Sequence, residues 1–302
     1  MSRIALIVVI GLLVASCQSV TPRTWDLPPA VKTIEANGYE MAYAERGAGT
    51  PVVLVHGSLS DYRYWAAQME PLGRTHRVIA VSLRHFYPEV WNGKGGDFSV
   101  EQHAKDLAAF IRRLNAGPAH LVGHSSGGDV ALLLAKRNPE LLRSLTLADP
   151  APLDRLMPAT AEAATETSAR RQFVQAAIAR LESNDIDGGL ESFADGAVGA
   201  GAWKKAPEQL RAGARQNAWT IKALPSAAQA DYACSDAAAI SVPVLLITGE
   251  KSPRIYGLML QGLAACLKHH KLASIPNAAH TMNRMNPNAF NRALAEFLVN
   301  QR

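Results

Sequence analysis

Six short apolar runs, separated by stretches of helical periodicity, constrain the fold of this 302-residue chain more than any other feature. They are rich in Val, Ile and Leu and span residues 51–56, 77–83, 120–123, 142–148, 242–248 and 271–275. Continuous apolar strands of this length are typical of parallel sheets that are buried on both faces. Helices are expected between them, the clearest over 99–115, where Ser99 and Gln102 form a capping box, and over 126–137. The alternation predicts an α/β fold with a mostly parallel central sheet flanked by helices.

The two ends of this pattern differ from its middle. Asn37-Gly38 separates residues 31–35 from 39–46 and favours a tight hairpin turn, so antiparallel strands should open the domain. Residues 151–232 contain no strand-like run, are rich in Ala, and have glycines at 188, 189, 196, 199 and 201 that we expect to break helices. We therefore predict a helical cap over 151–232, inserted after the strand that ends at Asp149. The core is then formed by residues 31–150 and 233–302.

The N-terminus has the pattern of an export signal. Met1-Ser2-Arg3 provides a positive start, and the apolar run that follows, residues 4–15, is too short to span a bilayer comfortably. The run ends in Val14-Ala15-Ser16-Cys17, which resembles the lipobox of bacterial lipoproteins. This resemblance implies a signal peptide over 1–16, a lipidated Cys17, a tether over 17–30 and a lipid-anchored enzyme of the bacterial cell envelope, on the periplasmic side. A plain secretory signal and an apolar N-terminal helix are the alternatives.

Charge and cysteine content restrict the partners. The formal charge is +5, but the basic residues are scattered and form no stripe with interleaved aromatic residues, so we expect no nucleic-acid partner. Apart from Cys17, the cysteines are Cys234 and Cys266. An oxidising compartment permits a disulfide between them, and two buried free thiols are the alternative. No metal or organic cofactor is implied, and the expected partners are a small-molecule substrate and the membrane.

The sequence Gly123-His124-Ser125-Ser126-Gly127 follows one strand-like run and precedes a helix. This strand, turn and helix setting is what a nucleophile elbow requires, because the glycines leave room in a sharp turn that exposes the serine. Together with the runs over 51–149 and 242–280, the motif resembles the α/β-hydrolase superfamily. The resemblance implies that Ser125 is a nucleophile.

A serine hydroxyl needs a base to activate it. His280 follows the last predicted strand, in a position that resembles the loop of the catalytic histidine in this superfamily. We expect His124 to be a packing residue. His76, His103 and His120 sit near helix or strand ends, where we expect surface positions.

The acid of the triad departs from the commonest family pattern. Many relatives carry an Asp where this chain has Ser252, in Gly249-Glu250-Lys251-Ser252. Another branch places the acid at the end of the preceding strand, where Asp149 stands. We predict that Asp149 orients His280, with Glu250 as the alternative. A turn-forming Asp-Pro and a surface glutamate are the structural interpretations of these two residues.

Two backbone N–H groups normally stabilise the oxyanion of acyl transfer. Ser126, after the nucleophile, and Ser58, in the His56-Gly57-Ser58-Leu59 loop that resembles the oxyanion loop of the family, are predicted to supply them, with Leu59 as an alternative to Ser58. The predicted function is a serine hydrolase that cleaves an ester of a small, apolar substrate through an acyl-enzyme on Ser125. Hydrolysis of a C–C bond, thioester or lactone is an alternative, as is a non-catalytic hydrolase-like protein that binds a ligand.

Overall fold

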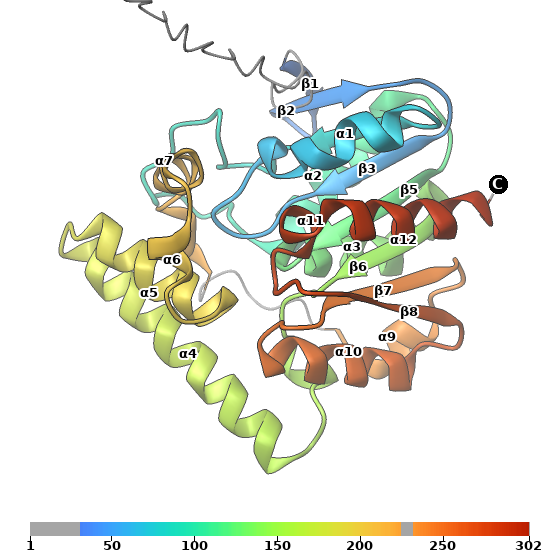
Figure 1. Cartoon of the computed structure of the whole chain (residues 1–302). Helices are drawn as coiled ribbons and strands as arrows, with labels where there is room; N and C mark the ends of the chain where they lie inside the picture. The colour runs from blue at the N-terminus through green and yellow to red at the C-terminus, as the bar shows by residue number, and fades with distance from the viewer. Residues whose placement is uncertain (1–30, 225–231, 302) are drawn as a thin grey trace, which may run out of the picture.

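The computed structural model describes residues 31–224 and 232–301, and its strands form one central sheet (Figure 1). The spatial order of the eight strands within these residues is β1-β2-β4-β3-β5-β6-β7-β8. Their bounds are β1 (Lys32–Ala36), β2 (Tyr39–Arg46), β3 (Pro51–Val55), β4 (Arg77–Val81), β5 (Ala119–His124), β6 (Leu142–Ala148), β7 (Val244–Gly249) and β8 (His270–Ile275). Each of the six predicted apolar runs overlaps one of the strands β3 to β8.

Strands β3 to β8 are parallel, whereas β1 and β2 join the sheet in antiparallel fashion. The predicted turn between β1 and β2 has Asn37 at φ 56° and Gly38 at φ 74°. Positive φ at both central residues is the conformation that this dipeptide accepts most readily. The predicted fold class, α/β with a mostly parallel central sheet, is confirmed.

Helices cover both faces of the sheet. The core helices are α1 (Ala66–Gly73), α2 (Val100–Leu114), α3 (Ser126–Arg137), α9 (Cys234–Ala238), α10 (Arg254–Cys266), α11 (Met282–Met285) and α12 (Pro287–Val299), with 3-10 turns at η1 (Tyr62–Trp65), η2 (Pro139–Leu141) and η3 (Asp154–Leu156). Alternate strand residues face opposite sides: Val53 belongs to the apolar cluster that includes residues of α2, α3 and α10, and its neighbour Leu54 to the one that includes residues of α1 and α12. The carboxyl ends of the parallel strands are left for the connecting loops.

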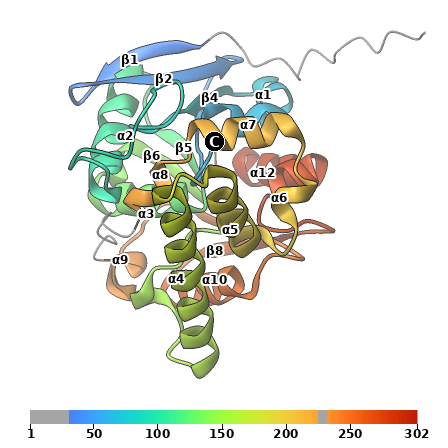
Figure 2. The ribbon, with the colours of Figure 1, turned by 90° about the vertical axis from the view of Figure 1, so that its left-hand side faces the viewer.

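The segment between β6 and β7 forms the cap. Its helices are α4 (Ala161–Glu182), α5 (Ile186–Val198), α6 (Ala202–Lys205), α7 (Glu208–Gln216) and α8 (Thr220–Ala223), and residues 225–231 of the predicted cap lie outside the described residues. Figure 2 shows α4 and α5 running side by side in front of the core. A small apolar cluster that includes Leu181, Leu190 and Trp203 holds these helices together.

The five cap glycines fall into two groups: Gly199 ends α5 and Gly201 precedes α6, as predicted, and the other three play a different part. Gly188, Gly189 and Gly196 lie inside or at the start of α5 and do not break it. A Cβ at Gly189 would meet the carbonyl oxygen of Ala177 at 2.9 Å, and one at Gly196 would meet the Phe173 ring at 2.3 Å. These two glycines therefore let α5 approach α4 closely. The residue pattern of α5 alone cannot indicate this contact between the two helices.

Two further features of the fold concern histidine and cysteine residues. His76, His103 and His120, predicted at the surface, are buried, with exposed fractions of 4%, 4% and 2%. Cys234 and Cys266 form a disulfide that joins the start of α9 to the end of α10, with a Cα–Cα distance of 5.1 Å.

Among the described residues, no helix is both long and apolar enough to cross a bilayer. The predicted signal peptide, Cys17 and the tether lie outside these residues.

Candidate active site

Ser125 stands in the sharp turn between β5 and α3, with φ 52° and ψ −126°. This conformation is unfavourable for a residue with a side chain and is held by its surroundings, among them a 3.1 Å hydrogen bond from the Ser125 N–H to the Ala148 carbonyl oxygen. A Cβ at Gly123 would lie 2.5 Å from the Gly127 carbonyl oxygen, and one at Gly127 would lie 2.3 Å from that of His56. Both glycines of the motif are therefore required by close backbone contacts, as the elbow geometry predicts.

His280 and Asp149 come together from two loops. The Nδ1 atom of His280 lies 3.4 Å from Oδ2 of Asp149, and both side chains are buried. Asp149 follows β6, with its N–H bonded to the Ile247 carbonyl oxygen of β7 at 2.9 Å. A carboxylate at Nδ1 selects the tautomer in which Nε2 is free to accept a proton.

Ser252 and Glu250 occupy different surroundings at the end of β7. The Ser252 hydroxyl donates to Oδ2 of Asp149 at 2.5 Å, and it accepts from the Gly249 N–H at 3.1 Å. Glu250 is exposed and accepts the Asn277 N–H at 2.7 Å. Ser252 thus fixes the carboxylate of Asp149, whereas Glu250 fastens the loop that leads to His280.

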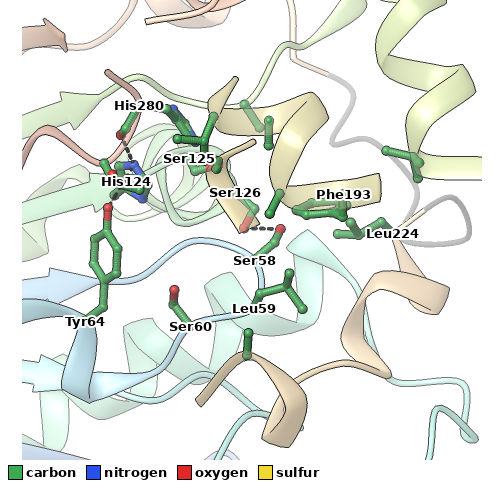
Figure 3. Close-up of a pocket in the computed structure, with 18 of the residues that line it drawn as sticks. Ser58, Leu59, Ser60, Tyr64, His124, Ser125, Ser126, Phe193, Leu224 and His280 are labelled. Atoms are coloured by element: carbon green, nitrogen blue, oxygen red, sulfur yellow. Dashed lines mark hydrogen bonds between the residues drawn. The ribbon is translucent and has the colours of Figure 1, made fainter. Parts of the chain in front are cut away.

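Two aromatic rings lie against the His280 ring. The Tyr256 ring stacks on it with centroids 3.9 Å apart. The centroid of the His124 ring lies 4.6 Å from that of His280, and Figure 3 shows these two histidines next to each other. His124 Nε2 lies 2.8 Å from the His280 carbonyl oxygen, and burial, followed by the nearby His280, holds the pKa of His124 well below its ordinary value. A neutral His124 that donates from Nε2 to this carbonyl group positions the His280 loop, in line with the packing role predicted for it.

The loop predicted to form the oxyanion hole lies against the elbow. A Cβ at Gly57 would come within 2.7 Å of Ser125 Cβ, and the hydroxyl of Ser58 donates to that of Ser126 at 3.2 Å (Figure 3). Ser126 is the first residue of α3, so its N–H has no acceptor within the helix. His56 bridges the loop to the neighbouring strand end through Gly57 O at 2.8 Å and the Leu83 N–H at 3.1 Å. Burial lowers the pKa of His56 to about 4, which keeps it neutral in this role.

A cavity of about 920 Å³ connects these groups with the cap. Ser125, His280, Ser58 and Ser126 all line it, and Figure 3 shows Ser125 and His280 together at one end with Ser58 and Ser126 beside them. The cap contributes largely apolar side chains, among them Phe193. Among the described residues, no hydrogen bond joins Ser125 Oγ to His280, and such contacts are often longer before a substrate is bound.

The matched family model covers residues 50–283 and describes the alpha/beta hydrolase fold. The chain belongs to this family. A 2-hydroxy-6-oxo-2,4-heptadienoate hydrolase of Pseudomonas putida is 35% identical over 119 residues, which are 38% of this chain and 43% of that protein. An (E)-2-((N-methylformamido)methylene)succinate hydrolase of Acinetobacter baylyi is 25% identical over 275 residues, 88% of this chain and 97% of that one. The chain spans less than half the length of several curated relatives that it matches.

Among solved structures, this α/β hydrolase is similar to a thermophilic esterase from Thermogutta terrifontis, with a TM-score of 0.65 and 25% identity over 90% of this chain and 99% of the esterase.

Three polar residues line the cavity of this α/β hydrolase at positions that were not predicted from the sequence. Asp129 lies one turn into α3, Arg170 on α4 and Tyr256 at the start of α10, and all three line the cavity. Asp129 directly follows Gly127-Gly128, so its distance of four residues from Ser125 was a usable signal, since residues four apart share a helix face. Arg170 and Tyr256 gave no such signal, because their proximity depends on how the cap packs.

Proposed function

We propose that this α/β hydrolase is a serine hydrolase that cleaves an ester bond through an acyl-enzyme on Ser125. The observation that carries the proposal is the contact of His280 Nδ1 with the buried Asp149 carboxylate, beside a serine in a left-handed elbow. This combination supplies a nucleophile, a base and a group that orients the base.

In the first half-reaction, Ser125 Oγ bonds to the ester carbonyl carbon while its proton passes to His280 Nε2. The negative charge that forms on the carbonyl oxygen is stabilised by the N–H groups of Ser58 and Ser126. The carbon–oxygen bond to the alcohol then breaks, and His280 gives its proton to the departing oxygen. In the second half-reaction, water attacks the acyl-enzyme with His280 as base, and the acid product and free Ser125 are released.

The proposed bond and substrate are supported by the lining of the cavity and by the relatives. The largely apolar cavity and the similarity to a named esterase support a small, apolar ester. Relatives named as hydrolases of a heptadienoate and of a succinate support the alternative that the same triad acts on another acyl or C–C bond. A non-catalytic, ligand-binding role is the alternative of a different class.

Labelling with a fluorophosphonate probe separates catalysis from ligand binding. We expect one adduct on the folded protein, located at Ser125, and none on the Ser125→Ala variant. Ser60→Ala is the matched control, since this serine also lines the cavity but has no role in the proposed reaction. An unlabelled wild type, or equal labelling of Ser125→Ala, contradicts the proposal. p-Nitrophenyl esters of increasing chain length then define the acyl preference.

We also propose that the enzyme is exported and anchored at the bacterial cell envelope through a lipid on Cys17. The lipobox-like Val14-Ala15-Ser16-Cys17 supports this proposal. The tether over 17–30 would leave the catalytic domain beside the membrane, on the periplasmic side.

A further inference from the structure

A polar cluster interrupts the largely apolar wall of the cavity. It consists of Asp129 on α3, Arg170 on the cap helix α4 and Tyr256 on α10, which we call the polar subsite. Three elements that are distant in the sequence supply one residue each. The cluster lies next to the proposed catalytic residues, because Tyr256 stacks on the His280 ring.

Asp129 is buried without a hydrogen-bond partner at one of its oxygens. Its exposed fraction is 7%, and Oδ1 has no partner among the described residues. Burial raises the pKa of Asp129 well above its ordinary value, while the positive charge of Arg170 acts in the opposite direction. The protonated carboxyl group, a hydrogen-bond donor, is favoured by this environment.

Arg170 and Tyr256 add further donors to the polar subsite. Arg170 is half-buried, and within the described part of the chain no residue forms a hydrogen bond or ion pair with its guanidinium group. Burial raises the pKa of the Tyr256 hydroxyl, which therefore stays protonated. A half-buried guanidinium without a protein partner is available to bind an anion, and a carboxylate matches its geometry best.

We propose that the polar subsite binds a carboxylate carried by the substrate, with Arg170 as the charged partner and Asp129 and Tyr256 as neutral hydrogen-bond donors. The substrate class is thus an ester that carries a carboxylate some distance from the bond that is cleaved. This inference rests on the proposed serine hydrolase function. Arg170 and Asp129 determine specificity here, and the chemistry remains that of Ser125 and His280.

The test compares esters that differ only in this charge. One pair, mono-p-nitrophenyl adipate and p-nitrophenyl hexanoate, places the carboxylate on the acyl side. The other pair, para-acetoxybenzoate and its methyl ester, places it on the alcohol side. For the wild type and each variant, kcat/KM for the anionic ester is divided by kcat/KM for the neutral ester. Because every protein is tested with the same two esters, the difference in reactivity of their leaving groups cancels when the ratios of two proteins are compared.

We expect Arg170→Gln to lower this ratio about tenfold in at least one pair, because a charge-assisted hydrogen bond contributes a factor of this order. Asp129→Asn should keep the ratio within about threefold of the wild type, since the amide N–H replaces the donor of a neutral acid. Arg180→Gln is the matched control. Arg180 lies on the same helix as Arg170 but does not line the cavity, and it is exposed and paired with Asp185, so its loss should leave both rates unchanged.

Two results would overturn the proposal. Asp129→Asn could lower the melting temperature and raise the ratio of kcat/KM for the anionic over the neutral ester tenfold or more. In that case Asp129 and Arg170 form a structural ion pair and not a subsite. If Arg170→Gln leaves the ratio unchanged in both pairs, or an ester with an ammonium tail is preferred, no carboxylate is recognised. Fluorophosphonate labelling of Ser125 in the same samples keeps the two proposals distinct: labelling without an anion preference refutes the subsite alone, and absent labelling refutes the hydrolase function.

Discussion

The acid of the proposed triad provides the most demanding prediction, because two neighbouring strands can each supply it. Asp149→Asn should lower kcat by about four orders of magnitude, the effect of the equivalent change in serine proteases, or roughly 5 kcal/mol of transition-state stabilisation. An amide at this position can present its N–H to His280 Nδ1 and so favour the wrong tautomer. The protein should still fold, since the change preserves the size of the side chain.

The same structure predicts a rescue. Ser252 Oγ lies 2.5 Å from Asp149 Oδ2, so a carboxylate at position 252 falls close to the place of the one that is lost. The double variant Asp149→Asn/Ser252→Asp should regain about two of the lost orders of magnitude in kcat. Its acid would then stand where many members of the family carry theirs.

Steady-state hydrolysis of a p-nitrophenyl ester measures both effects, with thermal unfolding as the check on folding. Glu250→Gln is the control, because Glu250 is exposed and contacts the Asn277 N–H, not His280, so kcat should change little. If Asp149→Asn retains activity within tenfold of the wild type while Glu250→Gln loses it, the assignment of Asp149 is wrong. A double variant as inactive as Asp149→Asn would refute the reasoning about the two strand ends.

Three further predictions concern stability and location. Burial lowers the pKa of both His56 and His103 from 6.5 to about 4, so the unfolded chain takes up protons below pH 6.5 that the folded protein does not. Each histidine should therefore reduce the free energy of unfolding by about 2 kcal/mol at pH 5 relative to neutral pH, and equal urea midpoints at both pH values would contradict this. Cys234 and Cys266 are 32 residues apart, and Cys266→Ser should lower the free energy of unfolding by about 2–4 kcal/mol in denaturant titrations under oxidising conditions; no change would show that the disulfide does not form. Cys17→Ser should move the protein from the membrane fraction to the soluble fraction, and mass spectrometry of the wild type should find a diacylglyceryl group on Cys17; retention of the variant in membranes would refute the anchor.

The parallel sheet was predictable because its strands are buried on both faces and leave continuous apolar runs in the sequence. The hairpin was equally accessible, since Asn37-Gly38 prescribes its own backbone conformation. Ser125 could be located because a sharp elbow needs glycines at fixed positions on either side. In these cases the physical requirement acts over a few neighbouring residues, so a short stretch of sequence contains all of it.

Features that depend on packing between distant segments were less accessible. Gly189 was interpreted as a helix break because the approach of α4 is invisible in the sequence of α5. His103 was expected at the surface, although tertiary packing buries it, because histidine has no strong preference for either environment. The polar subsite was missed for the same reason, since a cap helix brings Arg170 to the other two residues.

The proposed acid, Asp149, illustrates how topology allows a catalytic carboxylate to change strands. Strands β6 and β7 are parallel neighbours with Ala148 opposite Ile247, so their carboxyl ends open onto the same edge of the sheet. A carboxylate from either end can reach one imidazole, provided that the other end contributes a side chain that fills the space and satisfies the charge. Ser252 meets both conditions, because its hydroxyl is small and donates to Asp149. The hydroxyl at position 252 is therefore part of the same arrangement as the acid at 149, and Ser252→Ala should weaken His280 as a base by leaving Asp149 less firmly held.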